Sequence, residues 1–282
     1  MPDCLSCIWK YVFIMALMLG AVACERTQVA HEGAQEIFQG VWYTVEEMPG
    51  SNEAEGAVHL VRVDVQSEEI ELFATPVADT SATGAPRYPL RLTSLVARRE
   101  GLAVAINGSL FERPRWGYWP GARVRGLHTV VSDGEPSHVH PHSYLLWMDS
   151  DRQLHVERSK PPSPDVLEAA VWGIGGGEVI LRDGAPRSGT STEPDRRTML
   201  AIDAEGRYLF MAVFAHASFR AAAAAFLAEQ GADTGIMLDG GGSTVMHIGR
   251  DAAGGVGGTI FGGWRPVATH VGVRANPITN DR

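Results

Sequence analysis

The sequence predicts an α+β fold with a mixed, largely antiparallel sheet core, a few flanking helices and a single domain. Most of the apolar segments are short and follow one another across brief polar turns, which is typical of antiparallel hairpins. Only residues 92–100 and 219–230 show clear signs of a helix, each followed by a glycine that can end it, Gly101 and Gly231. We find no internal repeat and no second segment with its own core.

The composition indicates a globular protein and excludes one class of partner. The chain has 282 residues, of which 45% are hydrophobic and 20% charged, enough for a packed core. Its formal net charge is -9, and no basic block is present that could neutralise a phosphate backbone. We therefore expect no nucleic-acid partner.

The first residues resemble a bacterial lipoprotein signal. An apolar run from Tyr11 to Ala23 is too short to span a bilayer but has the length of a signal-peptide core. It ends in small residues before Cys24, which the resemblance makes the lipidated N-terminus of a membrane-anchored, extracytoplasmic protein. Glu25 after it would indicate the outer membrane in a Gram-negative host. The alternative is an ordinary secretory signal that is cut nearby.

These features divide the chain into four parts. We expect a signal peptide over residues 1–24, a flexible tether over 25–40, the folded domain over 41–275 and a tail over 276–282. No cysteine follows Cys24, so the mature domain has no disulfide and depends on its core for stability.

Several local features are predicted within the domain. Hairpins should join residues 58–65 to 70–74, 143–148 to 153–157, and 199–203 to 208–214. Ser218 should cap the second helix, and residues 254–263 should form a flexible loop.

The strongest candidate site follows the apolar run that starts at Ile236. This run leads into Asp239, three glycines (Gly240, Gly241 and Gly242) and a hydroxyl pair, Ser243 and Thr244. Glycines allow close approach and can direct successive N–H groups at an anion. One carboxylate, several donors and two hydroxyls could thus converge, although a simple tight turn is the alternative.

Other segments could contribute to the same site. Asn107 ends a second core strand, and Glu178 follows another glycine-rich run as a second carboxylate. Residues 111–126 are rich in arginine and aromatic residues, including Trp116 and Trp119, which suit sugar stacking or merely cap the core. His138, His140 and His142 alternate and could bind a metal if extended, but a solvated loop is favoured.

The order of these segments resembles the phosphodiester glycosidase family over roughly residues 41–275. The residues that carry the resemblance are Ala105 to Gly108, the glycine-rich run 173–181, Arg197-Thr198 at the start of a strand, and above all Leu238 to Thr244. The chain departs from the family pattern at Ser109-Leu110 and at His216-Ala217-Ser218.

The resemblance implies an exported hydrolase that releases a sugar from a sugar 1-phosphodiester or a related phosphorylated glycan. Asp239 would stabilise the oxocarbenium-like state with Glu178 as the second carboxylate. Substrate-binding residues would be Asn107, Arg197, Thr198, the three glycines, Ser243 and Thr244, with Arg197 on the phosphate. A structural ion pair between Arg197 and Asp239 is the alternative for that arginine.

Two other functions stay open. A noncatalytic envelope lipoprotein on the same fold could bind polysaccharide through its aromatic segment. Asp239 and the histidines could instead form a metal site. No cofactor or metal is assigned, a divalent cation is left open, and the expected partners are a phosphorylated carbohydrate and the membrane.

Overall fold

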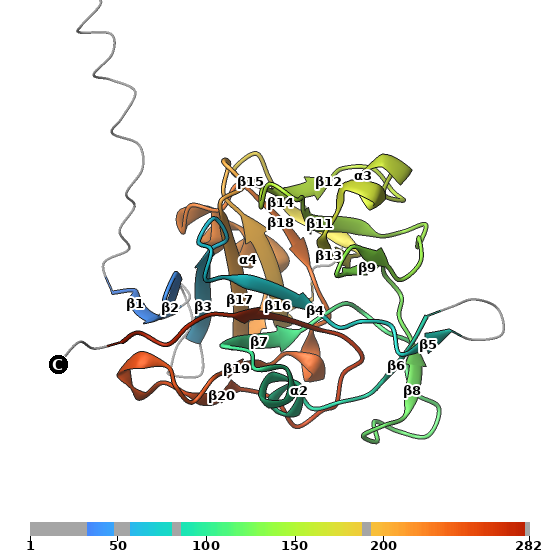
Figure 1. Ribbon diagram of the computed structural model, residues 1–282, viewed down its shortest axis with the longest axis horizontal. Helices are drawn as coiled ribbons and strands as arrows, with labels where there is room; N and C mark the ends of the chain where they lie inside the picture. The colour runs from blue at the N-terminus through green and yellow to red at the C-terminus, as the bar shows by residue number, and fades with distance from the viewer. Residues whose placement is uncertain (1–32, 48–56, 81–85, 188–192, 280–282) are drawn as a thin grey trace, which may run out of the picture. The chain divides into compact units, whose positions relative to one another are not determined.

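An eight-stranded sheet forms the centre of the fold in the computed structural model, which describes residues 33–47, 57–80, 86–187 and 193–279 (Figure 1). The described residues from Ala34 onward belong to one compact unit. In spatial order the strands of this sheet are β1 (Gln35–Phe38), β2 (Val41–Glu47), β3 (Ala57–Asp64), β17 (Tyr208–Ser218), β16 (Asp195–Ile202), β18 (Thr234–Met237), β14 (Glu178–Arg182) and β15 (Ala185–Pro186).

Three smaller sheets accompany it. The first comprises β10 (Glu135–Pro136), β9 (Val130–Ser132), β13 (Trp172–Gly176), β11 (Tyr144–Met148) and β12 (Leu154–Glu157). The second comprises β20 (Gly258–Phe261), β19 (Met246–Ile248), β7 (Val104–Asn107), β21 (His270–Arg274) and β4 (Glu71–Ala74). The third comprises β5 (Asp79–Thr80), β6 (Pro86–Pro89) and β8 (Arg123–Arg125).

The helices are short and few among the described residues. They are α2 (Thr93–Glu100), α3 (Pro164–Ala169) and α4 (Arg220–Glu229), with 3₁₀ turns η2 (Gly241–Ser243) and η3 (Ala253–Gly255). All strand pairings of the described ranges are antiparallel, which confirms the predicted α+β class and makes the sheets more uniform than the expected mixture. None of these helices is long and apolar enough to cross a membrane.

Strand β17 shows how the layers are built. Leu209, Met211 and Val213 point into the core shared with the two five-stranded sheets. Phe210, Ala212 and Phe214 point the other way, into a second core closed by α4, where Phe214 meets Phe226 edge to face at 5.8 Å. Burial on both faces explains why this strand is apolar throughout rather than alternating.

Helices α2 and α3 close the outer side of the five-stranded sheets. Val96 and Ala97 of α2 pack against Leu102 and Ala105. Leu167 of α3 packs on the neighbouring sheet. The resulting order of layers is helix, sheet, sheet, helix.

Several local predictions are confirmed. The hairpins β11–β12 and β16–β17 form as expected. Helix α2 ends at Gly101, which takes the left-handed conformation at φ 65°.

Others are wrong for identifiable reasons. The expected hairpin across residues 66–69 does not form, because β4 pairs with β21 from the end of the domain while β3 pairs with β2 and β17. Residues 258–261 of the expected flexible loop form β20 on β19. Ser218 is the last residue of β17, and α4 begins after Phe219 without a side-chain cap.

The N-terminal boundaries are only partly within the described residues. Strand β1 begins at Gln35, inside the segment predicted as a tether, and its Ile37 and Phe38 are buried in the main core. The predicted signal peptide and Cys24 lie outside the described residues.

Candidate functional site

Three strand ends meet around Asn107, the last residue of β7. Its side chain is fully buried, and its Oδ1 accepts hydrogen bonds from the Thr198 hydroxyl at 2.7 Å and the Val245 N–H at 3.1 Å. Its Nδ2 donates to the carbonyl of Asp239 at 2.7 Å. Asn107 and Thr198 therefore hold the strands and the Asp239 turn together, and their polar groups are used within the protein.

The residues after Asn107 add further hydrogen bonds to the network that holds the strands and the Asp239 turn together. The Gly108 carbonyl accepts from the Asp239 N–H at 3.1 Å, and the Gly108 N–H donates to Thr269 at 2.7 Å. A Cβ at Gly108 would lie 2.5 Å from the Thr269 hydroxyl oxygen, so this position requires glycine. Ser109, where the sequence departs from the family pattern, donates from its hydroxyl to the Gly175 carbonyl at 2.7 Å.

The Asp239 carboxylate lies against its own turn. The Gly240 N–H donates to its Oδ1 at 3.0 Å, and the Ser243 hydroxyl also bonds to it. Burial raises the pKa of Asp239, and nearby Asp195 adds to the rise, while Ser243, Gly240 and Arg265 oppose it.

The turn itself has geometry that needs glycine at two points. Gly241 has φ +59°, and a Cβ there would lie 3.1 Å from a carboxylate oxygen of Asp195. A Cβ at Gly242 would lie only 2.4 Å from the Arg265 guanidinium carbon. Because Gly241 and Gly242 have no side chains, the Asp195 carboxylate and the Arg265 guanidinium can lie directly against the turn.

Fewer donors remain free than the sequence suggested. The N–H groups of Ser243 and Thr244 bond to the carbonyls of Gly240 and Gly241 in the 3₁₀ turn. The Gly240 N–H is used by Asp239, so Gly241 and Gly242 are the described N–H groups of the turn left for a ligand. Both hydroxyl residues, Ser243 and Thr244, are buried at 2% exposure.

Arg197 forms no ion pair with Asp239 among the described residues, and two of its guanidinium nitrogens donate to backbone carbonyls. Its Nε donates to the Ser218 carbonyl and its Nη2 to the Glu193 carbonyl, both at 2.7 Å. Burial and nearby Arg220 lower its pKa. Arg197 anchors the start of β16 to the end of β17.

Glu178 forms part of a neighbouring ion pair. It lies opposite Met237 in the β14–β18 register and pairs with Arg220 at the start of α4. Asp195 lies beside the glycine-rich turn, where a Cβ at Gly241 would be 3.1 Å from its carboxylate, and its charge acts to raise the pKa of both Asp239 and Arg197. Asp195 is thus the neighbouring carboxylate whose charge adds to the raised pKa of Asp239.

Sequence reasoning missed Asp195 and Arg265. Asp195 begins β16 two residues before Arg197, and nothing in its local pattern distinguishes it from a surface acid. Arg265 lies two residues after the predicted flexible loop 254–263, and its guanidinium lies 4.4 Å from the ring centre of Tyr118. That contact brings the arginine- and aromatic-rich segment to the glycine-rich turn.

Three exposed tryptophans lie close to these residues in the sequence. Trp116 and Trp119 belong to the arginine- and aromatic-rich segment, and Trp264 directly precedes Arg265. Trp116, Trp119 and Trp264 are 81%, 68% and 95% exposed. Trp119 is fixed by a hydrogen bond from its indole to the Trp116 carbonyl at 2.7 Å. Exposed rings of this kind offer faces on which a sugar can stack.

The histidines gather in the loop before β11. His140 contacts His138, His142 and the buried His128 at ring distances of 5.8, 5.9 and 5.7 Å. Burial and neighbouring positive groups lower the pKa of His128 to about 4. Within the described ranges no group of three or more His, Cys, Asp or Glu is arranged to hold a metal.

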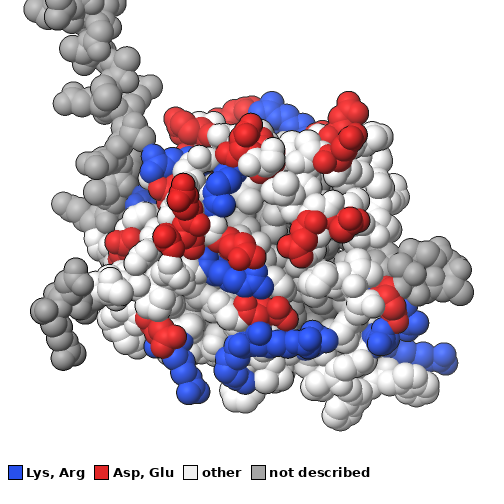
Figure 2. All heavy atoms as spheres, in the orientation of Figure 1, with Lys and Arg blue, Asp and Glu red and all other residues white. Residues whose placement is uncertain are grey.

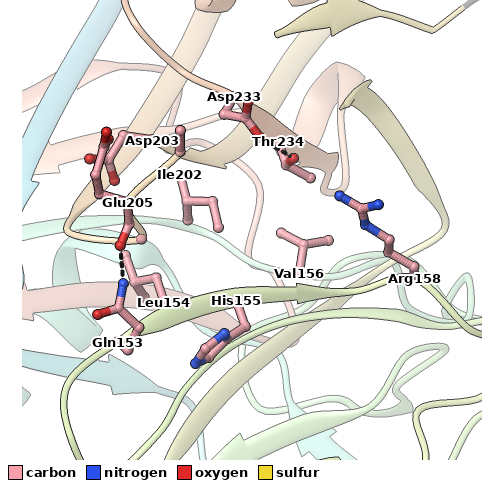
Figure 3. A pocket seen from close by; sticks show the side chains of 12 residues that line it. Gln153, Leu154, His155, Val156, Arg158, Ile202, Asp203, Glu205, Asp233 and Thr234 are labelled. Atoms are coloured by element: carbon pink, nitrogen blue, oxygen red, sulfur yellow. Dashed lines mark hydrogen bonds between the residues drawn. The ribbon is translucent and has the colours of Figure 1, made fainter. Parts of the chain in front are cut away.

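A separate cavity of about 260 Å³ lies at the other end of β16 and β18, beside β12 (Figure 3). It contains Asp203, Glu205 and Asp233, and the Asp203 carboxylate accepts the N–H groups of Arg207 and Tyr208 at 2.8 and 2.7 Å. None of the site residues predicted from sequence lines it.

The fold and the site define a layered antiparallel α+β domain with one acidic, glycine-rich turn where its strand ends meet. The chain belongs to the phosphodiester glycosidase family, whose profile matches residues 100–274. No curated protein matches the sequence closely enough to be counted as a relative.

Solved structures share the fold at low identity. A Synechocystis protein described as hypothetical has a TM-score of 0.62 at 16% identity, with 84% of this chain and 62% of that chain covered. This chain therefore spans less than two thirds of that protein. The zebrafish N-acetylglucosamine-1-phosphodiester alpha-N-acetylglucosaminidase catalytic domain, auto-inhibited by its pro-peptide, has a TM-score of 0.59 at 17% identity, covering 84% and 82%. A Burkholderia pseudomallei protein described as exported has a TM-score of 0.55 at 12% identity, covering 77% and 74%.

The role of Asn107 can be tested by its removal. Asn107→Ala leaves the Val245 N–H, the Thr198 hydroxyl and the Asp239 carbonyl without their partner, so we expect a loss of about 3 kcal/mol in unfolding free energy. Thr198→Val removes one of these bonds and should cost about 1 kcal/mol. Urea unfolding measures the free energy of unfolding of both variants. Equally small losses in the two variants would contradict the role of Asn107 in holding the strands and the turn together.

The raised pKa of Asp239 predicts a pH-dependent stability difference. Since the folded protein holds the Asp239 proton more tightly than the unfolded chain does, folding loses stability as the pH rises above the ordinary aspartate value of about 3.9. Asp239→Asn should therefore be more stable than the wild type at pH 7 and show no such advantage at pH 3. Thermal unfolding at both pH values tests this, and a less stable variant at pH 7 would refute it.

Proposed function

We propose that this protein is a hydrolase that releases a sugar from a sugar 1-phosphodiester or a related phosphorylated glycan. The observation that carries the proposal is the half-buried Asp239 carboxylate, which is held on a glycine-rich turn beside Arg265. Family membership supports the reaction class, and the zebrafish relative is named for removing N-acetylglucosamine from a phosphodiester.

In this proposal the turn and Arg265 bind the phosphate. A guanidinium and the free N–H groups of Gly241 and Gly242 are suited to phosphate oxygens. Arg265 takes the role that the sequence suggested for Arg197, because Arg197 already donates to two carbonyls. The neighbouring tryptophans offer stacking faces for the sugar.

Asp239 then acts on the anomeric carbon. Its raised pKa makes the carboxylate a stronger base than an ordinary aspartate, which suits activation of water or attack on the anomeric carbon. Asp195 is the nearer second carboxylate, with Glu178 beyond it. The leaving phosphomonoester has a second pKa of about 6, so its departure needs little help from a general acid.

We further propose that the protein is exported and anchored at Cys24, on the basis of the apolar run and small residues that precede this cysteine. Its substrates would then be glycans of the cell envelope or its surroundings. The proposed steps use groups of the protein itself, and assistance by a divalent cation is left open.

A noncatalytic polysaccharide binder is the second candidate. The three exposed tryptophans favour it, because solvent-facing indoles are a feature of sugar-binding surfaces as well as of active sites. Such a protein would bind anionic glycan without forming product, and binding would survive Asp239→Asn.

The test uses the chain from Glu25 onward and a panel of sugar 1-phosphodiesters, with free sugar and phosphomonoester both quantified. We expect the wild type to release both products and Asp239→Asn to lose at least about 100-fold in kcat/KM, as for removal of a catalytic base. Asp233→Asn, at the opposite end of β18, is the matched control and should retain activity.

Unchanged hydrolysis by folded Asp239→Asn would refute the role of Asp239. Glycan binding by both proteins without any product would favour the binder.

A further inference from the structure

A second cavity, of about 430 Å³, lies at the end of β7 away from Asp239. Leu102 and Ala103, just before β7, line it, whereas Asn107 at the far end of this strand bonds to Asp239. Its other walls come from the end of β1, the end of α2, the segment after β19 and the C-terminal segment. This volume is in the range of small-molecule sites.

Two arginines at the cavity have no carboxylate partner among the described residues. Arg98 from α2 and Arg250 after β19 both line it, and neither forms an ion pair in that part of the chain. Nearby Arg99 and Arg274 differ, because each is paired with Glu100 and Arg274 also pairs with Glu71. In the lower part of Figure 2, basic side chains lie over the region of α2, with acidic side chains close by.

His247 forms a polar wall of the same cavity. It is only 6% exposed, and its Nδ1 lies 3.0 Å from the Thr259 hydroxyl, which fixes the ring. Its Nε2 bonds to no described residue. Burial, followed by Arg98 and Arg250, lowers the His247 pKa, so the ring is neutral at pH 7 and both arginines lie within electrostatic range of it. When Thr259 donates to Nδ1, Nε2 carries the hydrogen and is a donor.

The remaining walls are largely apolar. Phe38 and Leu102 contribute a phenyl ring and an isobutyl group, and both are buried in the cores beneath. Asp251 is the one acidic residue that lines the cavity, against two arginines. The site therefore combines excess positive charge, one neutral donor and an apolar wall.

We propose that this cavity binds an organic phosphate, with Arg98, Arg250 and His247 on the phosphate and Phe38 and Leu102 against its apolar body. Three donors, one from α2 and two from β19 and the turn after it, match the three terminal oxygens of a phosphate monoester better than the two oxygens of a carboxylate. The site is distinct from the Asp239 turn, and the proposal does not depend on the hydrolase function.

Calorimetric titration with phenyl phosphate tests the proposal on the chain from Glu25 onward. We expect saturable binding that Arg98→Ala and Arg250→Ala each weaken about tenfold, as for loss of a charge-assisted hydrogen bond. Arg99→Ala, one position along α2 and outside the cavity, is the matched control and should bind like the wild type. His247→Phe, which fills the same space without a donor, should also bind more weakly.

The source of the phosphate is distinguished by a second arm. Sedimentation with vesicles of phosphatidylglycerol, compared with phosphatidylcholine, measures binding to a lipid phosphate. Binding in either arm that depends on Arg98 and Arg250 supports the site and identifies the source as a soluble ester or a lipid headgroup. Absence of binding in both arms, or binding equally strong in the Arg98 and Arg99 variants, would overturn it.

Discussion

The hydrogen bonds of one buried asparagine determine where the candidate site lies. Asn107 ends β7 and joins the Thr198 hydroxyl of β16, the N–H before β19 and the carbonyl of Asp239. These partners belong to both of the stacked sheets, so the amide fixes the register between the layers as well as the turn. A buried amide with both ends satisfied gains this specificity without the penalty of an unpaired polar group.

The ionised form of Asp239 in the glycine-rich turn lowers the stability of the folded protein. Burial raises the pKa of Asp239, and the nearby Asp195 carboxylate adds to that effect. The opposing contacts from Ser243, the Gly240 N–H and Arg265 lower the cost but do not cancel it. Groups kept in unfavourable protonation equilibria are common at functional sites, because the same environment that destabilises the ionised form makes it chemically useful.

The sequence predicted local structure well and long-range pairing poorly. The stop of α2 at Gly101 and the β16–β17 hairpin depend on residues close in the chain, and both were predictable. The partner of β4 is β21, nearly two hundred residues away, and no local pattern encodes such a pairing. Likewise Asp239 and its glycines were found from sequence, whereas Arg265 and Asp195 reach the turn only through the fold. The carbonyl partners of Arg197 were not predictable, because a buried arginine that bonds carbonyls has the same sequence appearance as one that binds a ligand.

The proposed hydrolase cleaves the bond between the anomeric carbon and oxygen, and not a bond to phosphorus. Both cleavages can yield the same sugar and phosphomonoester, so the products alone do not separate them. Hydrolysis of a sugar 1-phosphodiester in ¹⁸O-labelled water, followed by mass spectrometry of both products, does. For the proposed cleavage we expect the label to enter the sugar, and label in the phosphomonoester would contradict it.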